Sequence, residues 1–168
     1  DWRGEPRHPD RHCRRGRPTP VVYGCTESHA AAGHAVAIVR GGGCLRCGLG
    51  RTGVPEFQVV NWPNDAGTTL EEPACGAHYQ PYGPIELGFV SSLVAQLALD
   101  GLLGKIAISS ARIYAALRST VEDLGGRWTA DWVREYPARV DGGAFVDRAW
   151  SSGPCVACSR PKTGPAEI

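Results

Sequence analysis

Two C-x-x-C pairs constrain the fold of this chain more than any other feature of its sequence. The first, in GGGCLRCGLG (41–50), supplies Cys44 and Cys47, and the second, in GPCVACSR (153–160), supplies Cys155 and Cys158. Two intervening residues let both thiolates of a pair face one ion, and two such pairs make a tetrahedral four-cysteine zinc site. Because residues 48–154, 107 in all, separate the pairs, this site would tie the end of the chain to its middle.

A closed site of four thiolates leaves no coordination position for a substrate, so its expected role is structural. The alternative is that the two pairs are unrelated and hold redox or free thiols. The chain has 7 cysteines, an odd number, and shows no secretory signal. These features favour metal over disulfides and predict a cytoplasmic location.

The composition is that of one ordinary globular domain. The chain has 168 residues, of which 42% are hydrophobic and 21% charged, with a net charge of +1. This balance argues against nucleic acid or a membrane surface as the partner. Arginines gather in residues 1–19, where we expect a solvated, linker-like segment.

Apolar runs predict one strand at 20–25 and another at 35–40, with a loop or turn at 26–34 between them. Residues 48–83 are rich in Gly, Pro and Asn and show little periodicity. A loop of this length in a compact domain is usually functional or mobile. Residues 127–150 are predicted to be rich in strands.

The clearest predicted element is a helix over residues 84–104. Pro84 suits the first helical turn and Gly104 suits the C-terminal stop. The helix is apolar on most sides, so we expect it to be buried. Three polar residues argue against a membrane span: Glu86, Gln96 and Asp100. A weaker helical pattern follows in 105–124.

The motifs along the chain are, in order, PVVYGC, AAGHAVAIVRGGGCLRCGL, an irregular loop, GPIELGFVSSLVAQLALDGLLG and PCVAC. This order of motifs resembles the second half of the ThiF/MoeB superfamily. This is the adenylating core of the ubiquitin-activating enzymes and their bacterial relatives. The resemblance covers nearly the whole chain. It implies an α/β fold that continues a Rossmann-like core, with a mixed or parallel sheet, helix 84–104 packed on it, a structural zinc site and a crossover loop at about 48–83.

Residues 1–168 would then form the C-terminal part of an adenylation domain. Members of the family bind ATP through a Gly-rich loop. This sequence has no G-x-G-x-x-G motif at the start of a predicted helix. We therefore expect the ATP-binding half to precede Asp1, and this chain alone to bind ATP poorly. Asp1 resembles the family aspartate that helps hold Mg-ATP, in keeping with the preference of magnesium for oxygen ligands. An arbitrary terminal aspartate is the alternative.

The resemblance implies that ATP activates the C-terminus of a ubiquitin-like or sulfur-carrier protein. Many members of the family then move the acyl group to a cysteine in the crossover loop, where this chain has Cys75 in EEPACGAHYQPYG. His78 lies three residues on, and an imidazolium there could lower the pKa of the thiol. Alternatively, Cys75 is a spare or structural thiol, or joins His78 in a metal site.

Other candidates have plainer interpretations. Cys13 and Cys25 are expected to be small packing residues, and His29 and His34 turn residues, although either could line a channel for the partner's tail. A ubiquitin-conjugating-like partner and a homodimer are also implied by the resemblance. The competing hypothesis is a non-catalytic, zinc-stabilised module that binds a ubiquitin-like partner or dimerises.

Overall fold

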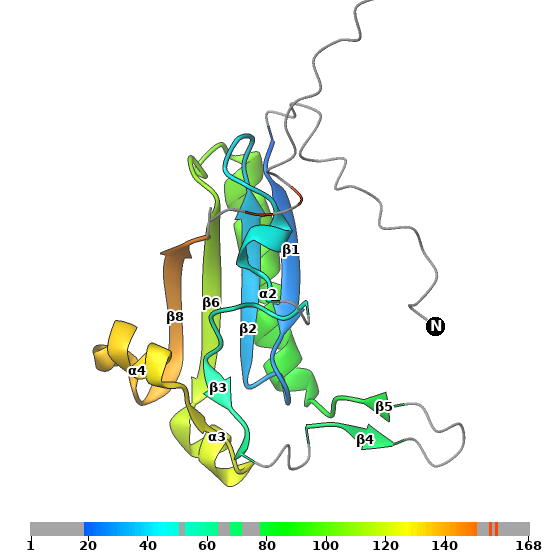
Figure 1. Cartoon of the computed structure of the whole chain (residues 1–168), viewed down its shortest axis with the longest axis vertical. Coiled ribbons are helices and arrows are strands. Elements are labelled where there is room, and N and C mark those ends of the chain that lie inside the picture. The colour runs from blue at the N-terminus through cyan, green and yellow to red at the C-terminus, as the bar shows by residue number, and fades with distance from the viewer. Residues whose placement is uncertain are drawn as a thin grey trace, which may run out of the picture.

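The computed structural model describes residues 19–50, 53–63, 68–71, 78–150, 155 and 157. A sheet with helices packed on it confirms the coarse prediction of a mixed helix-and-strand fold. The central sheet has the order β1-β2-β6-β8 (Figure 1). Its strands are β1 (Val21–Thr26), β2 (Ala32–Ile38), β6 (Ser110–Leu117) and β8 (Gly142–Ala149).

Every neighbouring pair in this sheet is antiparallel. The prediction of a mixed or parallel sheet is therefore wrong for these four strands. The connection between β1 and β2 gives the physical reason, because residues 27–31 are far too few for the crossover that parallel strands need. The hydrogen bond from the Glu27 N–H to the Ala32 carbonyl, at 2.9 Å, closes the turn. Strand β2 consequently begins earlier than its predicted start at residue 35.

The predicted long helix is α2 (Pro84–Leu102), which has Pro in its first turn. It packs on β1, β2 and β6. Only one side is buried, through Val90, Leu93, Leu97 and Gly101. The expectation of a buried helix is therefore wrong for the opposite side, where Leu99 is 52% exposed. The apolar residues surround the helix, but the sheet covers only one side of it.

The second predicted helix, over 105–124, is wrong in its first half. Residues 110–117 form strand β6, and only α3 (Arg118–Asp123) is helical. Strand β6 lies inside the sheet, and Ile113, Tyr114, Ala115 and Ala116 are all buried. A strand covered on both faces has no polar alternation, so its apolar residues imitate a helical spacing.

The region 127–150 is less strand-rich than predicted. It contains β7 (Arg127–Trp128), the helix α4 (Ala130–Glu135), the turn η3 (Pro137–Arg139) and β8. The Thr129 hydroxyl caps α4 by accepting the Trp132 N–H at 3.1 Å. The core residue Trp132 is fully buried.

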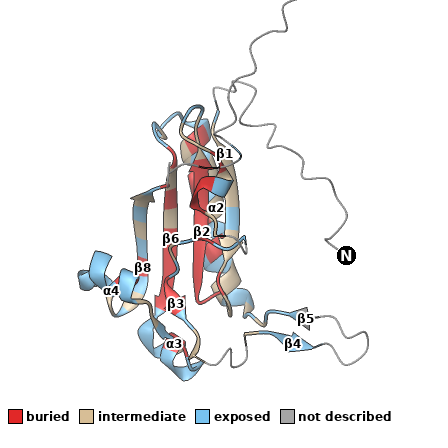
Figure 2. Ribbon diagram, viewed as in Figure 1, coloured by how far each residue is buried: buried red, intermediate tan, exposed pale blue. Residues whose placement is uncertain are grey.

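Helix α2 covers one face of the sheet, and the chain from η1 (Leu45–Gly48) to β3 (Val60–Asn61) crosses the other (Figure 1). Strand β3 pairs with β7. Two short strands, β4 (Leu70–Glu71) and β5 (His78–Tyr79), pair beside the main body. The buried residues concentrate in β2 and β6, between these two layers (Figure 2).

Candidate metal centre

Three cysteines of the two C-x-x-C pairs meet in a buried cluster. After β2, Gly41 and Gly43 adopt positive φ angles of 80° and 89°, a left-handed backbone that glycine adopts without strain. They turn the chain into η1, so that Cys44 and Cys47 bracket a tight turn. The Cys47 N–H donates to the Cys44 carbonyl at 3.0 Å, and the Cys44 N–H donates to the Cys47 Sγ at 3.3 Å. We call residues 44–48 the knuckle.

Cys155 reaches the knuckle from the far end of the chain. Its Sγ lies 3.9 Å from that of Cys44, which in turn lies 3.9 Å from that of Cys47. The three sulfur atoms all lie within 4.8 Å of one another. At most 9% of each residue is exposed to solvent.

The sulfur spacing fits a metal ion. Thiolates bound tetrahedrally at about 2.3 Å from zinc stand about 3.8 Å apart. A disulfide needs about 2.05 Å. Three buried, soft sulfur ligands at metal-binding spacing could therefore hold an ion, and the structure brings together three of the four cysteines of the predicted site.

The other predicted site residues lie wholly or partly outside the described residues. Cys158, the predicted fourth ligand, lies outside them, as do Asp1 and the candidate nucleophile Cys75. Cys13, which was predicted to be a packing residue, also lies outside them. His78 pairs with Glu71 through the backbone of β5, but its side chain is not among those described. The fourth ligand and the roles of Asp1, Cys75 and His78 stay predictions.

Cys25 lies in β1 and is half-buried. Burial, together with the negative charge of Glu27, raises the pKa of its thiol from 9.0 to about 11. The thiol is thus protonated at neutral pH and is a poor nucleophile. This agrees with its predicted packing role.

A buried acid–base pair near the β1–β2 turn was not anticipated from the sequence. The Glu27 carboxylate lies 2.8 Å from His34 Nε2 and accepts the N–H groups of Val59 and Val60 at 2.8 and 2.9 Å. His34 is thus a buried strand residue of β2 rather than a turn residue. The sequence around Glu27 does not indicate that its carboxylate will bind backbone N–H groups more than thirty residues away.

His29 does lie in the turn, as predicted, with a left-handed φ of 59°. Its ring packs against that of Trp62 in a tilted arrangement, with 4.6 Å between the ring centroids. Burial lowers the pKa of the imidazole below its ordinary value. Its Nε2 has no hydrogen-bond partner within the described part of the chain.

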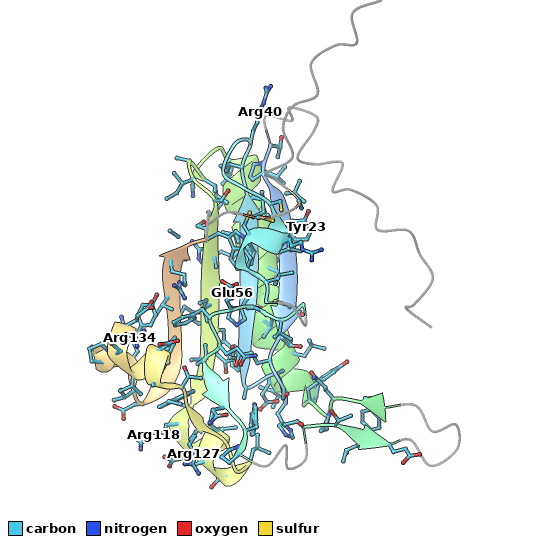
Figure 3. The ribbon with its side chains drawn as sticks, in the orientation of Figure 1. Tyr23, Arg40, Glu56, Arg118, Arg127 and Arg134 are labelled. Atoms are coloured by element: carbon cyan, nitrogen blue, oxygen red, sulfur yellow. The ribbon has the colours of Figure 1, made fainter. Side chains whose placement is uncertain are left out.

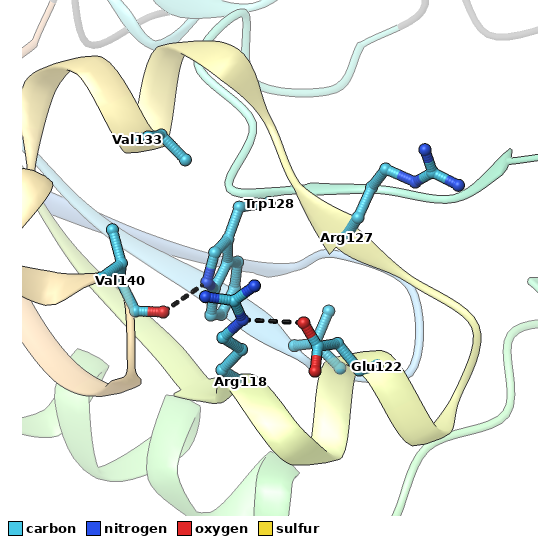
Figure 4. Close-up of a pocket in the computed structure, with 7 residues that line it drawn as sticks. Arg118, Glu122, Arg127, Trp128, Val133 and Val140 are labelled. Atoms are coloured by element: carbon cyan, nitrogen blue, oxygen red, sulfur yellow. Dashed lines mark hydrogen bonds and ion pairs between the residues drawn. The ribbon is translucent and has the colours of Figure 1, made fainter.

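A separate pocket of about 350 Å³ lies against α3 and β7 (Figure 4). Within α3, Arg118 donates to Glu122 at 2.7 Å, and the Trp128 indole donates to the Val140 carbonyl at 2.7 Å. The pocket follows the end of β6, whereas the knuckle follows the end of β2. Because β2 and β6 are antiparallel, the two sites lie at opposite ends of the sheet, as Arg40 and Arg127 show in Figure 3. No predicted site residue is among the described residues that line this pocket.

By length and composition, α2 could also cross a membrane, with a mean hydropathy of 1.4 and 22% of its apolar window buried. Core helices of soluble proteins meet the same criterion, so this feature of α2 is only weak evidence for a membrane span.

Comparison with family models finds no match, and comparisons with curated proteins and with solved structures find none either.

Proposed function

We propose that this chain is the metal-binding, C-terminal part of a ThiF/MoeB-type enzyme, which uses ATP to activate the C-terminus of another protein. The observation that carries the proposal is the meeting of Cys155 with Cys44 and Cys47 across more than a hundred residues. It supports the order of features on which the sequence resemblance rests: strand pair, knuckle, long loop, helix and returning C-x-x-C.

In this proposal the ion is zinc, and Cys158 completes the site. All four ligands would come from protein, so the ion would be structural and would take no part in the reaction. Magnesium and ATP would be bound largely by residues outside this chain, with Asp1 contributing one carboxylate. The knuckle and the second C-x-x-C pair, held by one ion, would then keep the two ends of residues 48–154 close together. The long loop lies within this region.

The proposed reaction has two steps. A carboxylate oxygen at the C-terminus of a ubiquitin-like or sulfur-carrier protein attacks the α-phosphorus of ATP, and pyrophosphate leaves. The Cys75 thiolate then attacks the acyl carbon, and AMP leaves as the thioester forms. His78 would favour the thiolate of Cys75, because a neighbouring imidazolium lowers the pKa of the thiol.

The test uses the full-length protein and a candidate partner protein. Adenylation predicts exchange of radiolabelled pyrophosphate into ATP, which must stop when the last residues of the partner are deleted. Cys75→Ala should keep this exchange and lose the DTT-sensitive adduct. Cys25→Ala is the matched control and should keep both, because the raised pKa of Cys25 makes it unreactive. An adduct that survives Cys75→Ala would show that the nucleophile is another residue.

A second candidate is the non-catalytic binding or dimerisation module. It is favoured by the outer side of α2, where every exposed position is uncharged although water-facing helices normally carry charges there. At the edge of this side, Phe89 of α2 stacks on Tyr114 of β6 with 5.1 Å between the ring centroids, and the Tyr114 ring lies 5.3 Å from that of Phe145. Partner binding without pyrophosphate exchange would favour this module over the enzyme.

A further inference from the structure

Trp150 connects the end of the sheet to the knuckle. Its backbone N–H donates to the Ser109 carbonyl at 3.0 Å, beside the start of β6. Its indole Nε1–H donates to the Cys44 carbonyl at 3.1 Å, and this hydrogen bond is buried. The main chain of Trp150 is thus held at the sheet while its side chain holds the first metal-binding cysteine.

The same indole packs against the other end of the knuckle. A Cβ built on Gly48 would lie 2.5 Å from Cζ2 of Trp150, closer than real Cβ contacts allow. The ring therefore occupies the space that a side chain at position 48 would need. Through one hydrogen bond and one close contact, Trp150 fixes both Cys44 and Gly48, and Cys47 lies between them.

We propose that Trp150 is a positioning residue of the metal centre, which holds the knuckle in the arrangement where the Cys44 and Cys47 sulfurs meet that of Cys155. This inference rests on the proposed metal site and not on the proposed adenylation. Fixing the Cys44 carbonyl orients the peptide that carries the cysteine, so less chain ordering remains to be done when the ion binds. Replacing a residue that orients metal ligands in this way typically lowers metal affinity by about 10–100-fold.

Cobalt(II) is the probe for this role, because its thiolate charge-transfer and d–d absorption bands report tetrahedral sulfur coordination. Trp150→Phe removes the hydrogen bond to Cys44 and keeps an aromatic ring. We expect cobalt affinity, measured by competition with a chelator in the full-length protein, to fall by about 10-fold or more. Circular dichroism should show an unchanged fold.

Trp128→Phe is the matched control. The Trp128 indole also donates to a backbone carbonyl, that of Val140 at 2.7 Å, but in the pocket beyond the other end of the sheet. Its replacement removes the same kind of bond and should leave cobalt affinity and the absorption bands unchanged.

Gly48→Ala tests the contact from the opposite side. The added methyl group would push against the Trp150 ring, so cobalt affinity should fall in this variant as well. Phenylalanine is smaller than tryptophan at the point of contact, so Gly48→Ala should cost less affinity in the Trp150→Phe background. This non-additivity is a signature of direct contact that a general loss of stability does not produce.

Unchanged cobalt affinity in Trp150→Phe, or an equal loss in Trp128→Phe, would overturn the positioning role. Additive effects of Gly48→Ala and Trp150→Phe would also contradict it. If the unaltered protein binds no metal, the centre itself is wrong and the role of Trp150 fails with it. Absence of pyrophosphate exchange would refute only the adenylation and would leave the role of Trp150 standing.

Discussion

At the scale of single residues, the Glu27 carboxylate connects three separate parts of the chain through buried hydrogen bonds. It is buried, faces His34, and accepts two successive backbone N–H groups from Val59 and Val60. Those donors belong to the segment that leads from the knuckle into β3. Glu27 therefore holds this segment against the β1–β2 turn, because a buried N–H without an acceptor is costly.

Replacing Glu27 by glutamine should destabilise the protein. The amide nitrogen of glutamine cannot accept a backbone N–H, so the variant loses at least one buried, charge-assisted bond. We expect the free energy of unfolding to fall by about 1–3 kcal/mol, as measured by urea denaturation. Glu122→Gln, at an exposed ion pair with Arg118, should leave it nearly unchanged, because solvent screens such pairs. Equal effects of the two variants would contradict the role of Glu27.

Cys25 should resist alkylation in the native protein. With a pKa of about 11, only about one thiol in a thousand is ionised at pH 8, and the thiolate is the reactive form. Its labelling by iodoacetamide, followed by peptide mass spectrometry, should accelerate as pH rises from 8 towards 11. Unfolding in urea should abolish the protection. Rapid labelling of native Cys25 at pH 7 would show that its pKa is not raised.

At the scale of elements, two glycines set how closely α2 approaches the sheet. A Cβ on Gly33 would lie 2.3 Å from Val90 Cγ2, and one on Gly24 would lie 2.6 Å from Val94 Cγ2. Strands β1 and β2 thus present bare backbone to the helix, which lets valine side chains pack directly on it. This close approach buries one side of a helix whose other side remains exposed.

Gly33→Ala should therefore force α2 away from the sheet. Overpacking of a tight contact costs about 1–3 kcal/mol, seen as a lower midpoint in thermal or urea unfolding. Gly88→Ala is the matched control, since a Cβ there meets nothing within 4 Å. Because alanine favours helix over glycine by about 0.5–1 kcal/mol, this variant should be more stable than the unaltered protein. A stable Gly33→Ala protein would mean that the helix is packed more loosely.

At the scale of the whole molecule, the cysteine cluster joins distant parts of the chain. The knuckle follows β2, and Cys155 follows β8, strands that are separated in the sheet by β6. A bound ion would therefore act across the sheet, and its binding free energy would add to the stability of the folded state.

Metal removal should accordingly destabilise the whole domain. At a free metal concentration about a hundredfold above Kd, binding adds about 2.7 kcal/mol, which a chelator should abolish in urea unfolding. Cys155→Ser should unfold at the same urea concentration with or without chelator. Cys25→Ser, outside the cluster, should keep the sensitivity to chelator. Metal analysis of the same samples identifies the ion. Full metal content in Cys155→Ser would contradict the role of Cys155 as a metal ligand.

The closeness of Cys44 to Cys47 and the long helix could be predicted from the sequence because their signals are local. Cys44 and Cys47 are brought together by the spacing itself, and Pro84 begins α2 as expected. Strand β6 was predicted wrongly because its burial on both faces depends on β2 and β8, which are its neighbours only in the folded sheet. Nothing local distinguishes Ile113 in such a strand from Ile113 in a buried helix.

By itself, the sequence determined which residues could bind a metal and roughly where the chain forms its first two strands and its long helix. Tertiary structure alone decided the antiparallel order of the sheet, the exposed side of α2, the contacts of Glu27 and the place of Trp150 against the knuckle. The physical reason is distance along the chain. Cysteine spacing and helix caps act within a few residues, whereas Trp150 and Cys44 are 106 residues apart and meet only when the sheet has formed.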